Sequence, residues 1–171
     1  MAFVMETQEL KRWCWAAVAV SVKHFFSAGS ALTQCQVATP VLIQEGKIPV
    51  ARICCLTKNL CNFTANLQDA LNLPSTNNLR QIVTAPLPFD GAQSVKSEIG
   101  RPSNTPIAAR IGWSNGGGHF IALIGYKEYG SGAQTVHVAD PYYGPSWQYY
   151  DDLLDFYLED GAWSDSFLLK A

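Results

Sequence analysis

The sequence carries little charge, and the charges that it has are almost balanced. Only 15% of its residues are charged, with 12 Lys and Arg against 14 Asp and Glu, for a formal net charge of −2. Proteins that bind nucleic acid or an anionic membrane surface present a field of basic side chains, and this chain has none. We therefore expect neither nucleic acid nor a membrane among its partners.

Long hydrophobic runs are also missing. No apolar stretch approaches the roughly 20 residues that a membrane-spanning helix requires. The apolar start, Met1 to Met5, is followed directly by Glu6 and Glu9. It has neither the basic segment nor the longer apolar segment of a signal peptide. The sequence predicts a cytosolic chain, a mature form, or a chain that leaves the cell by another route.

The composition that remains predicts a single globular α+β domain. Hydrophobic residues make up 48% of the chain, and 13 Gly and 9 Pro indicate many turns and a sheet. Helical patterns come first and strand patterns later, so we expect a helical half over about residues 1–75 and an antiparallel sheet half over about 76–171. The expected helices are 13–26, 33–43 (interrupted by Pro40), 66–73 and 93–99, and the expected strands are 79–84, 106–113, 119–126, 135–140 and 163–169.

Four of the five cysteines are clustered, and the fifth, Cys14, stands alone. The cluster could form two disulfides, for which three pairings are possible, or it could remain as buried thiols. Zinc is a further alternative, but adjacent cysteines do not match the usual ligand spacing of a structural zinc site. Disulfides would place the protein in an oxidising compartment, as an exported protein, and their absence would favour the cytoplasm. The clustered residues are Cys35, Cys54, Cys55 and Cys61.

Cys14 stands at the first turn of the helix expected over 13–26. The N-terminal end of a helix carries partial positive charge and unpaired N–H groups, and both favour a thiolate. A thiolate is the form of cysteine that attacks carbonyl carbon. Cys14 is therefore a candidate nucleophile. The alternative is a core cysteine, since free cysteine is among the most buried residue types.

A nucleophilic thiol needs a base, and the chain has only three histidines. His24 lies on the same helix as Cys14, roughly 15 Å along its axis, and cannot reach the thiol. His137 lies in the middle of a strand and is expected to be structural or solvent-facing. His119 begins a strand directly after a glycine-rich turn, where its ring can enter a cleft. We predict His119 as the base, with a turn histidine as the alternative.

Two further residues complete the candidate site. Asp140 ends the strand beside that of His119, where a carboxylate can orient the imidazole, although an Asp before Pro is also common in turns. Gln8 lies six residues before Cys14 and could donate to an oxyanion together with the backbone N–H of Cys14, although a Gln in a polar segment is usually exposed. Asp151, Asp152 and Asp155 are weaker alternatives to Asp140, because they fall on a solvated acidic helix face.

In this order, the motifs resemble those of papain-like cysteine proteases. The closest resemblance is to the compact bacterial C39-like and AvrRpt2-like (C70) branches. The chain departs from the plant and lysosomal signature, because Trp13 precedes the cysteine and the third member is Asp. The motifs that carry the resemblance are Gln8, Cys14-Trp15-Ala16-Ala17, Gly118-His119-Phe120 and Val138-Ala139-Asp140-Pro141.

The resemblance implies a papain-like fold, no cofactor or metal, and a monomer that cleaves protein or peptide substrates. It implies that Cys14 is the nucleophile, His119 the base and then the acid, and Asp140 the orienting group. Gln8 would bind the oxyanion. Two alternatives remain open: an amidase of peptidoglycan peptides or a transglutaminase-like acyl transferase with the same triad, and a catalytically silent binding module with this fold.

Overall fold

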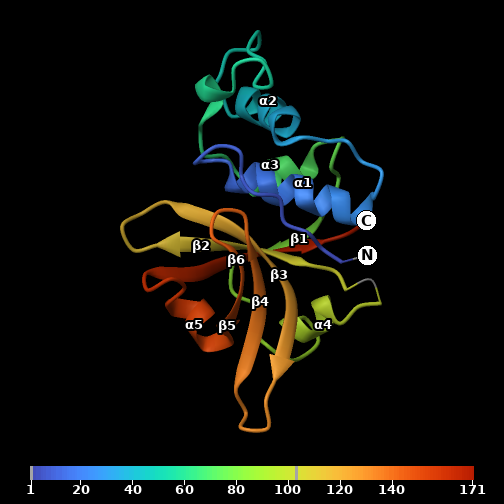
Figure 1. The fold of residues 1–171 in the computed structure, drawn as a ribbon, viewed down its shortest axis with the longest axis vertical. Coiled ribbons are helices and arrows are strands. Elements are labelled where there is room, and N and C mark those ends of the chain that lie inside the picture. Colours follow the sequence, from blue (N-terminus) through green and yellow to red (C-terminus); the bar gives the residue numbers. More distant parts are fainter. Residues whose placement is uncertain (1, 103) are drawn as a thin grey trace.

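A computed structural model describes residues 2–102 and 104–171 of the protein. Its N-terminal part is helical, with α1 (Cys14–Phe26), α2 (Gln34–Gln44), the 3₁₀ helix η1 (Lys58–Cys61) and α3 (Leu67–Asn72). These helices lie together on one side of a sheet (Figure 1). The first strand, β1 (Leu79–Val83), begins only after them. The predicted order of helices before strands is confirmed.

The sheet has six strands in the order β1-β6-β2-β3-β4-β5, and every neighbouring pair is antiparallel. This confirms the predicted α+β class. Two short helices, α4 (Val95–Ile99) and α5 (Tyr150–Asp155), accompany it. The remaining strands are β2 (Ile107–Trp113), β3 (Gly118–Glu128), β4 (Gln134–Asp140), β5 (Gly144–Tyr149) and β6 (Gly161–Leu169).

Both faces of the sheet are covered, which explains why its central strands read as continuous apolar runs. Alternate residues of a strand point to opposite faces. Accordingly Ala108 and Phe120 pack in the core shared with α1–α3. Their neighbours Ile107, Ala109 and Ile121 pack in a second core on the other face.

Helix α1 is the centre of the helical layer. Its residues from Cys14 to Val22 are all buried, and it contacts α2, α3 and strand β3. The two tryptophans beside Cys14 are fully buried, and each indole N–H donates to a backbone carbonyl of the cysteine-rich loop. Trp13 donates to Cys61 O at 2.8 Å and Trp15 to Phe63 O at 3.2 Å. These bonds satisfy buried polar groups and hold the start of α1 in one position.

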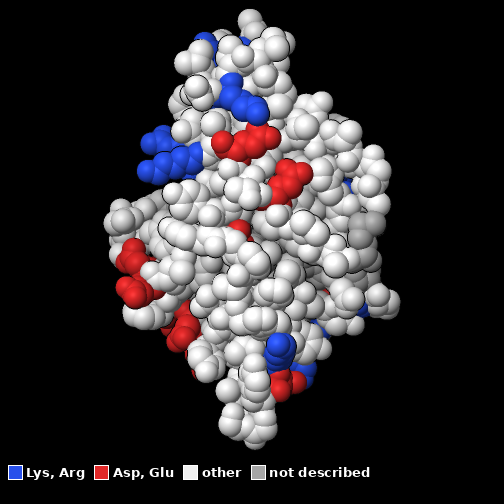
Figure 2. Space-filling view, in the orientation of Figure 1, with Lys and Arg blue, Asp and Glu red and all other residues white. Residues whose placement is uncertain are grey.

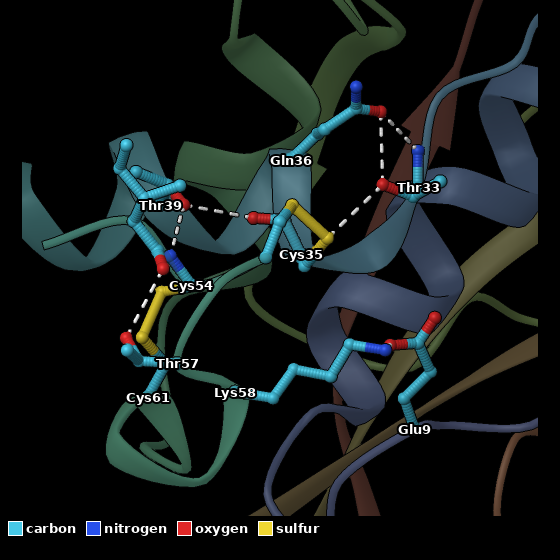
Figure 3. The surroundings of a disulfide bond; sticks show 11 residues. Glu9, Thr33, Cys35, Gln36, Thr39, Cys54, Thr57, Lys58 and Cys61 are labelled. Carbon is cyan, nitrogen blue, oxygen red and sulfur yellow. Dashed lines mark hydrogen bonds and ion pairs between the residues drawn. A yellow bond between two sulfur atoms is a disulfide. The ribbon is translucent and has the colours of Figure 1, made fainter.

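The four clustered cysteines form two disulfides, Cys35–Cys55 and Cys54–Cys61 (Figure 3). They close loops with sequence separations of 20 and 7 residues, which corresponds in the chain-entropy model to about 3 and about 2 kcal/mol of stabilisation. The same loop is tied to the N-terminal segment by Lys58, whose ammonium lies 2.7 Å from the Glu9 carboxylate. All four sulfurs are therefore engaged, and none is a thiolate that could bind zinc.

Several features of the fold, including the 3₁₀ helix η1, differ from the sequence prediction. Pro40 does not end the second helix, which runs on to Gln44. The proline lies on the exposed side of α2, where water can reach the carbonyl that lacks an intrahelical N–H partner. Burial of Val37, Val41 and Leu42 on the opposite side holds the helix together. In addition, β5 was not predicted.

The surface is sparsely charged. Figure 2 shows uncharged side chains over most of the visible face, with basic and acidic groups in small separate clusters. Within residues 2–102 and 104–171, none of the helices has the length and apolar character of a membrane span.

Candidate active site

Helix α1 begins at a pocket of about 400 Å³ between the helical layer and the end of the sheet. Among the described residues Cys14 is the one free cysteine; it is only 7% exposed and lines this pocket. The Cys14 N–H has no backbone acceptor within the residues that the structure describes, as expected for the first residue of a helix. The lining is made up of Gln8, Lys11, Arg12, Cys14, Thr64, Trp113, Gly118, His119, Tyr142 and Tyr143.

His119 enters the same pocket from the start of β3. It follows a turn in which Gly116 and Gly117 have φ values of +90° and +88°, a conformation that residues with side chains rarely adopt. Its Nε2 lies 2.8 Å from Oδ2 of Asp140, at the end of the neighbouring strand β4. The Cys14 side chain lines the same pocket, close enough to His119 for the two groups to interact electrostatically. Because Nε2 is engaged with Asp140, Nδ1 is the ring nitrogen that remains for the thiol.

The protonation of His119 depends on its two partners. Burial alone would lower the pKa of His119, but the hydrogen bond to Asp140, the interaction with Cys14 and the negative charges of both groups outweigh it and raise the pKa from 6.5 to about 9. The imidazole is therefore charged at neutral pH. This geometry suits an imidazolium held between a carboxylate and a sulfur.

Asp140 is held by four donors. Its Oδ1 accepts the backbone N–H groups of Tyr142 at 2.7 Å and Tyr143 at 2.9 Å, and its Oδ2 accepts from His119 and from the hydroxyl of Tyr157, each at 2.8 Å. Burial would raise the pKa of Asp140, but the hydrogen bond and charge of His119 and the two backbone N–H groups lower it overall. The carboxylate is thus ionised although it is 3% exposed.

Two residues around this pair were missed by sequence reasoning. Tyr157 lies in the turn before β6, and no local pattern links it to Asp140. The Trp113 ring stacks against both His119 and Tyr157, with centroid distances of 6.3 and 6.5 Å. The backbone donors were foreseeable, because an Asp commonly accepts the N–H groups two and three residues later in a turn.

Gln8 also lines the pocket and is buried. Its backbone N–H donates to Pro141 O at 2.9 Å, so the segment before α1 is fastened to the residue after Asp140. Its side-chain Nε2 donates to Leu10 O at 2.9 Å and to Lys11 O at 2.8 Å. Its Oε1 is buried and has no hydrogen-bond partner.

The other candidates lie elsewhere. His24 pairs with Glu6 at 3.1 Å. His137 stacks on Trp147 with a centroid distance of 4.7 Å, and its pKa is lowered by partial burial and by the nearby charge of Lys127. Across the described part of the chain, no three His, Cys, Asp or Glu side chains group as metal ligands would. The exposed acidic residues of α5 are Asp151, Asp152 and Asp155.

The chain was compared with known protein families and with curated proteins. Among curated proteins, no sequence similar to this chain is found. The family model described as papain-like cysteine protease AvrRpt2, peptidase family C70, matches residues 1–156. Since this match covers most of the chain, the protein belongs to the AvrRpt2 family of papain-like cysteine proteases.

Proposed function

We propose that the protein hydrolyses peptide bonds through an acyl-enzyme thioester, with Cys14 as nucleophile, His119 as base and acid, and Asp140 as the orienting group. One observation carries this proposal: Asp140 hydrogen-bonds His119, and His119 and Cys14 interact in the same pocket. A nucleophile bonded to a base, and a base bonded to an orienting group, is the arrangement that covalent acyl transfer requires.

The steps follow from this geometry. The Cys14 sulfur, as thiolate, attacks the carbonyl carbon of the substrate and forms a tetrahedral intermediate. His119 then gives its Nδ1 proton to the departing amine nitrogen, the C–N bond breaks, and a thioester remains on Cys14. Water attacks the thioester while His119 accepts one of its protons, the C–S bond breaks, and the carboxylic acid product leaves with the Cys14 thiolate and the charged His119 regenerated. Asp140 stays ionised and holds Nε2–H throughout.

The negative oxygen of the intermediate needs donors. The N–H of Cys14 is available at the positive end of α1. Gln8 is proposed as the second donor. Both hydrogens of its Nε2 are used by Leu10 O and Lys11 O in this structure, so this role requires one of the two bonds to be exchanged for a bond to the substrate.

The function is tested by cleavage and labelling together. We expect the protein to cut a denatured protein substrate into fragments with new N-termini, identified by mass spectrometry. A thiol-directed epoxide should abolish this activity and add one adduct at Cys14, because the other four cysteines are in disulfides. Incorporation of an added amine would indicate acyl transfer, and release of cell-wall peptides would indicate an amidase. A folded protein that is neither labelled nor active would contradict the proposal.

The pH dependence provides a second test. We expect kcat/KM to fall at high pH with a midpoint near 9, because the leaving amine needs the His119 proton and the pKa of His119 is about 9. Stability should change in the same range. The folded-state pKa lies above the ordinary 6.5, so the stabilisation is complete below pH 6.5 and is lost as pH rises through about 9.

The value of kcat/KM is measured with an uncharged peptide substrate. Stability is measured by thermal unfolding over the same pH series. The Cys14→Ala variant is the control for unfolding, since His119 loses a neighbour that raises its pKa. Its stability should therefore fall less above pH 6.5, and the fall should end at a lower pH than in the wild type. A base limb of activity near 6.5 in the wild-type protein would contradict the raised pKa.

The two disulfides fit an oxidising environment. We therefore propose that the protein works after export, on protein or peptide substrates.

A further inference from the structure

The turn that precedes β6 reaches into the second core behind His119 and Asp140. Tyr157 begins this turn and is 1% exposed. Its backbone N–H donates to Gly161 O at 2.7 Å, and Gly161 N–H donates back to Tyr157 O at 2.8 Å. These two bonds hold the backbone of Tyr157 in place. Its hydroxyl donates to Asp140 Oδ2 at 2.8 Å.

The backbone conformation of this turn costs free energy. Leu158 and Glu159 have φ values of 50° and 73°, in the left-handed region that side-chain-bearing residues avoid. Gly161 lies so close to β2 that a Cβ there would meet the Ile111 side chain at 2.5 Å and the Trp113 ring at 2.7 Å. The fold therefore accepts an unfavourable turn and a required glycine where Tyr157 meets Asp140.

We infer that Tyr157 is a positioning residue for the proposed peptidase reaction: its hydroxyl holds Asp140 Oδ2, and through Asp140 it sets the orientation of the His119 ring toward Cys14. The inference rests on the proposed function for its effect on catalysis. If only the two backbone N–H groups held Oδ1, the carboxylate could still rotate and move Oδ2. The bond from the Tyr157 hydroxyl to Oδ2 prevents this movement.

The contact also has an electrostatic effect. A hydrogen bond to a carboxylate favours its charged form, so Tyr157 stabilises ionised Asp140 inside the second core. Burial and the Asp140 charge raise the pKa of Tyr157, so the phenol remains a donor across the working range of pH. Tyr157 thus keeps Asp140 available as a charged partner for His119 at mildly acid pH.

The test is the Tyr157→Phe variant, which keeps the ring and its contact with Trp113 and removes only the hydroxyl. We expect kcat/KM at neutral pH to fall about tenfold. The acid limb of the pH profile, where Asp140 becomes protonated, should move up by about one pH unit, because Asp140 loses a donor. The matched control is Tyr150→Phe, which removes an equally short bond, 2.8 Å to Leu87 O, at a distance from the pocket. That variant should lower stability and leave the pH profile unchanged.

Two further measurements separate the possible outcomes. In an Asp140→Ala background, Tyr157→Phe should have almost no additional effect on kcat/KM, because Tyr157 acts through Asp140. If the wild type cleaves peptides but Tyr157→Phe leaves the acid limb in place, or its effect persists without Asp140, the positioning role is overturned while the proposed function stands. If the wild type is inactive, NMR titration of the His119 ring still decides whether Tyr157 acts on the pair. An upward shift of the Asp140 ionisation step, seen at the His119 ring of Tyr157→Phe, supports the inference, and an unchanged step overturns it.

Discussion

Replacing Cys14 by alanine is expected to lower the rate of peptide hydrolysis by roughly four to six orders of magnitude while the protein stays folded. The thiolate forms the covalent bond to the substrate, and no other described cysteine is free to replace it. The substitution removes a single sulfur from a residue at the edge of the pocket, so stability should fall by only about 1 kcal/mol. The rate is measured with a fluorogenic peptide, and the folded state is checked by circular dichroism and thermal unfolding.

Cys14→Ser is the matched control for packing. Serine has nearly the same size and keeps a polar group beside His119, but its hydroxyl is not ionised at neutral pH, so it should be almost as inactive as alanine. Loss of activity in both variants therefore reports the sulfur and not a cavity. Activity above about 1% of wild type in either variant would assign the nucleophile to another group.

The sequence allowed good prediction of the elements that bring the site together. The apolar run after Cys14 contains no Gly or Pro and predicted a buried helix. The glycines before His119 predicted a turn. The Val136 to Asp140 pattern then predicted the neighbouring strand. Because each of these signals is local, the order of helix, turn and strand end could be read without long-range information.

What could not be predicted depends on contacts between distant segments. The disulfide pairing has three combinatorial solutions, and only the packing of the loop against α2 selects one of them. Tyr157 meets Asp140 through a turn whose backbone conformation its residue types disfavour, so propensity argues against it. The bonds of the Gln8 amide to Leu10 O and Lys11 O likewise follow from the path of the chain before α1, which no spacing rule describes.

Replacing Asp140 by asparagine is expected to reduce kcat/KM by roughly three to four orders of magnitude, although the change is nearly isosteric. The reason is the set of four donors around the carboxylate. An amide nitrogen in the Oδ1 position would face the N–H groups of Tyr142 and Tyr143, which cannot turn away. The nitrogen should therefore occupy the Oδ2 position and donate to His119 Nε2.

That bond would force the proton of neutral His119 onto Nδ1, so that an N–H points at Cys14 and the imidazole can no longer accept the thiol proton. NMR of the His119 ring nitrogens should report the changed tautomer, alongside kinetics with the peptide substrate. Asp155→Asn, an exposed carboxylate on α5, is the control for the chemical change itself and should keep wild-type activity. An Asp140→Asn variant within tenfold of wild type would mean that Asp140 orients the imidazole by shape alone, and that its charge and its four donors serve the stability of the fold.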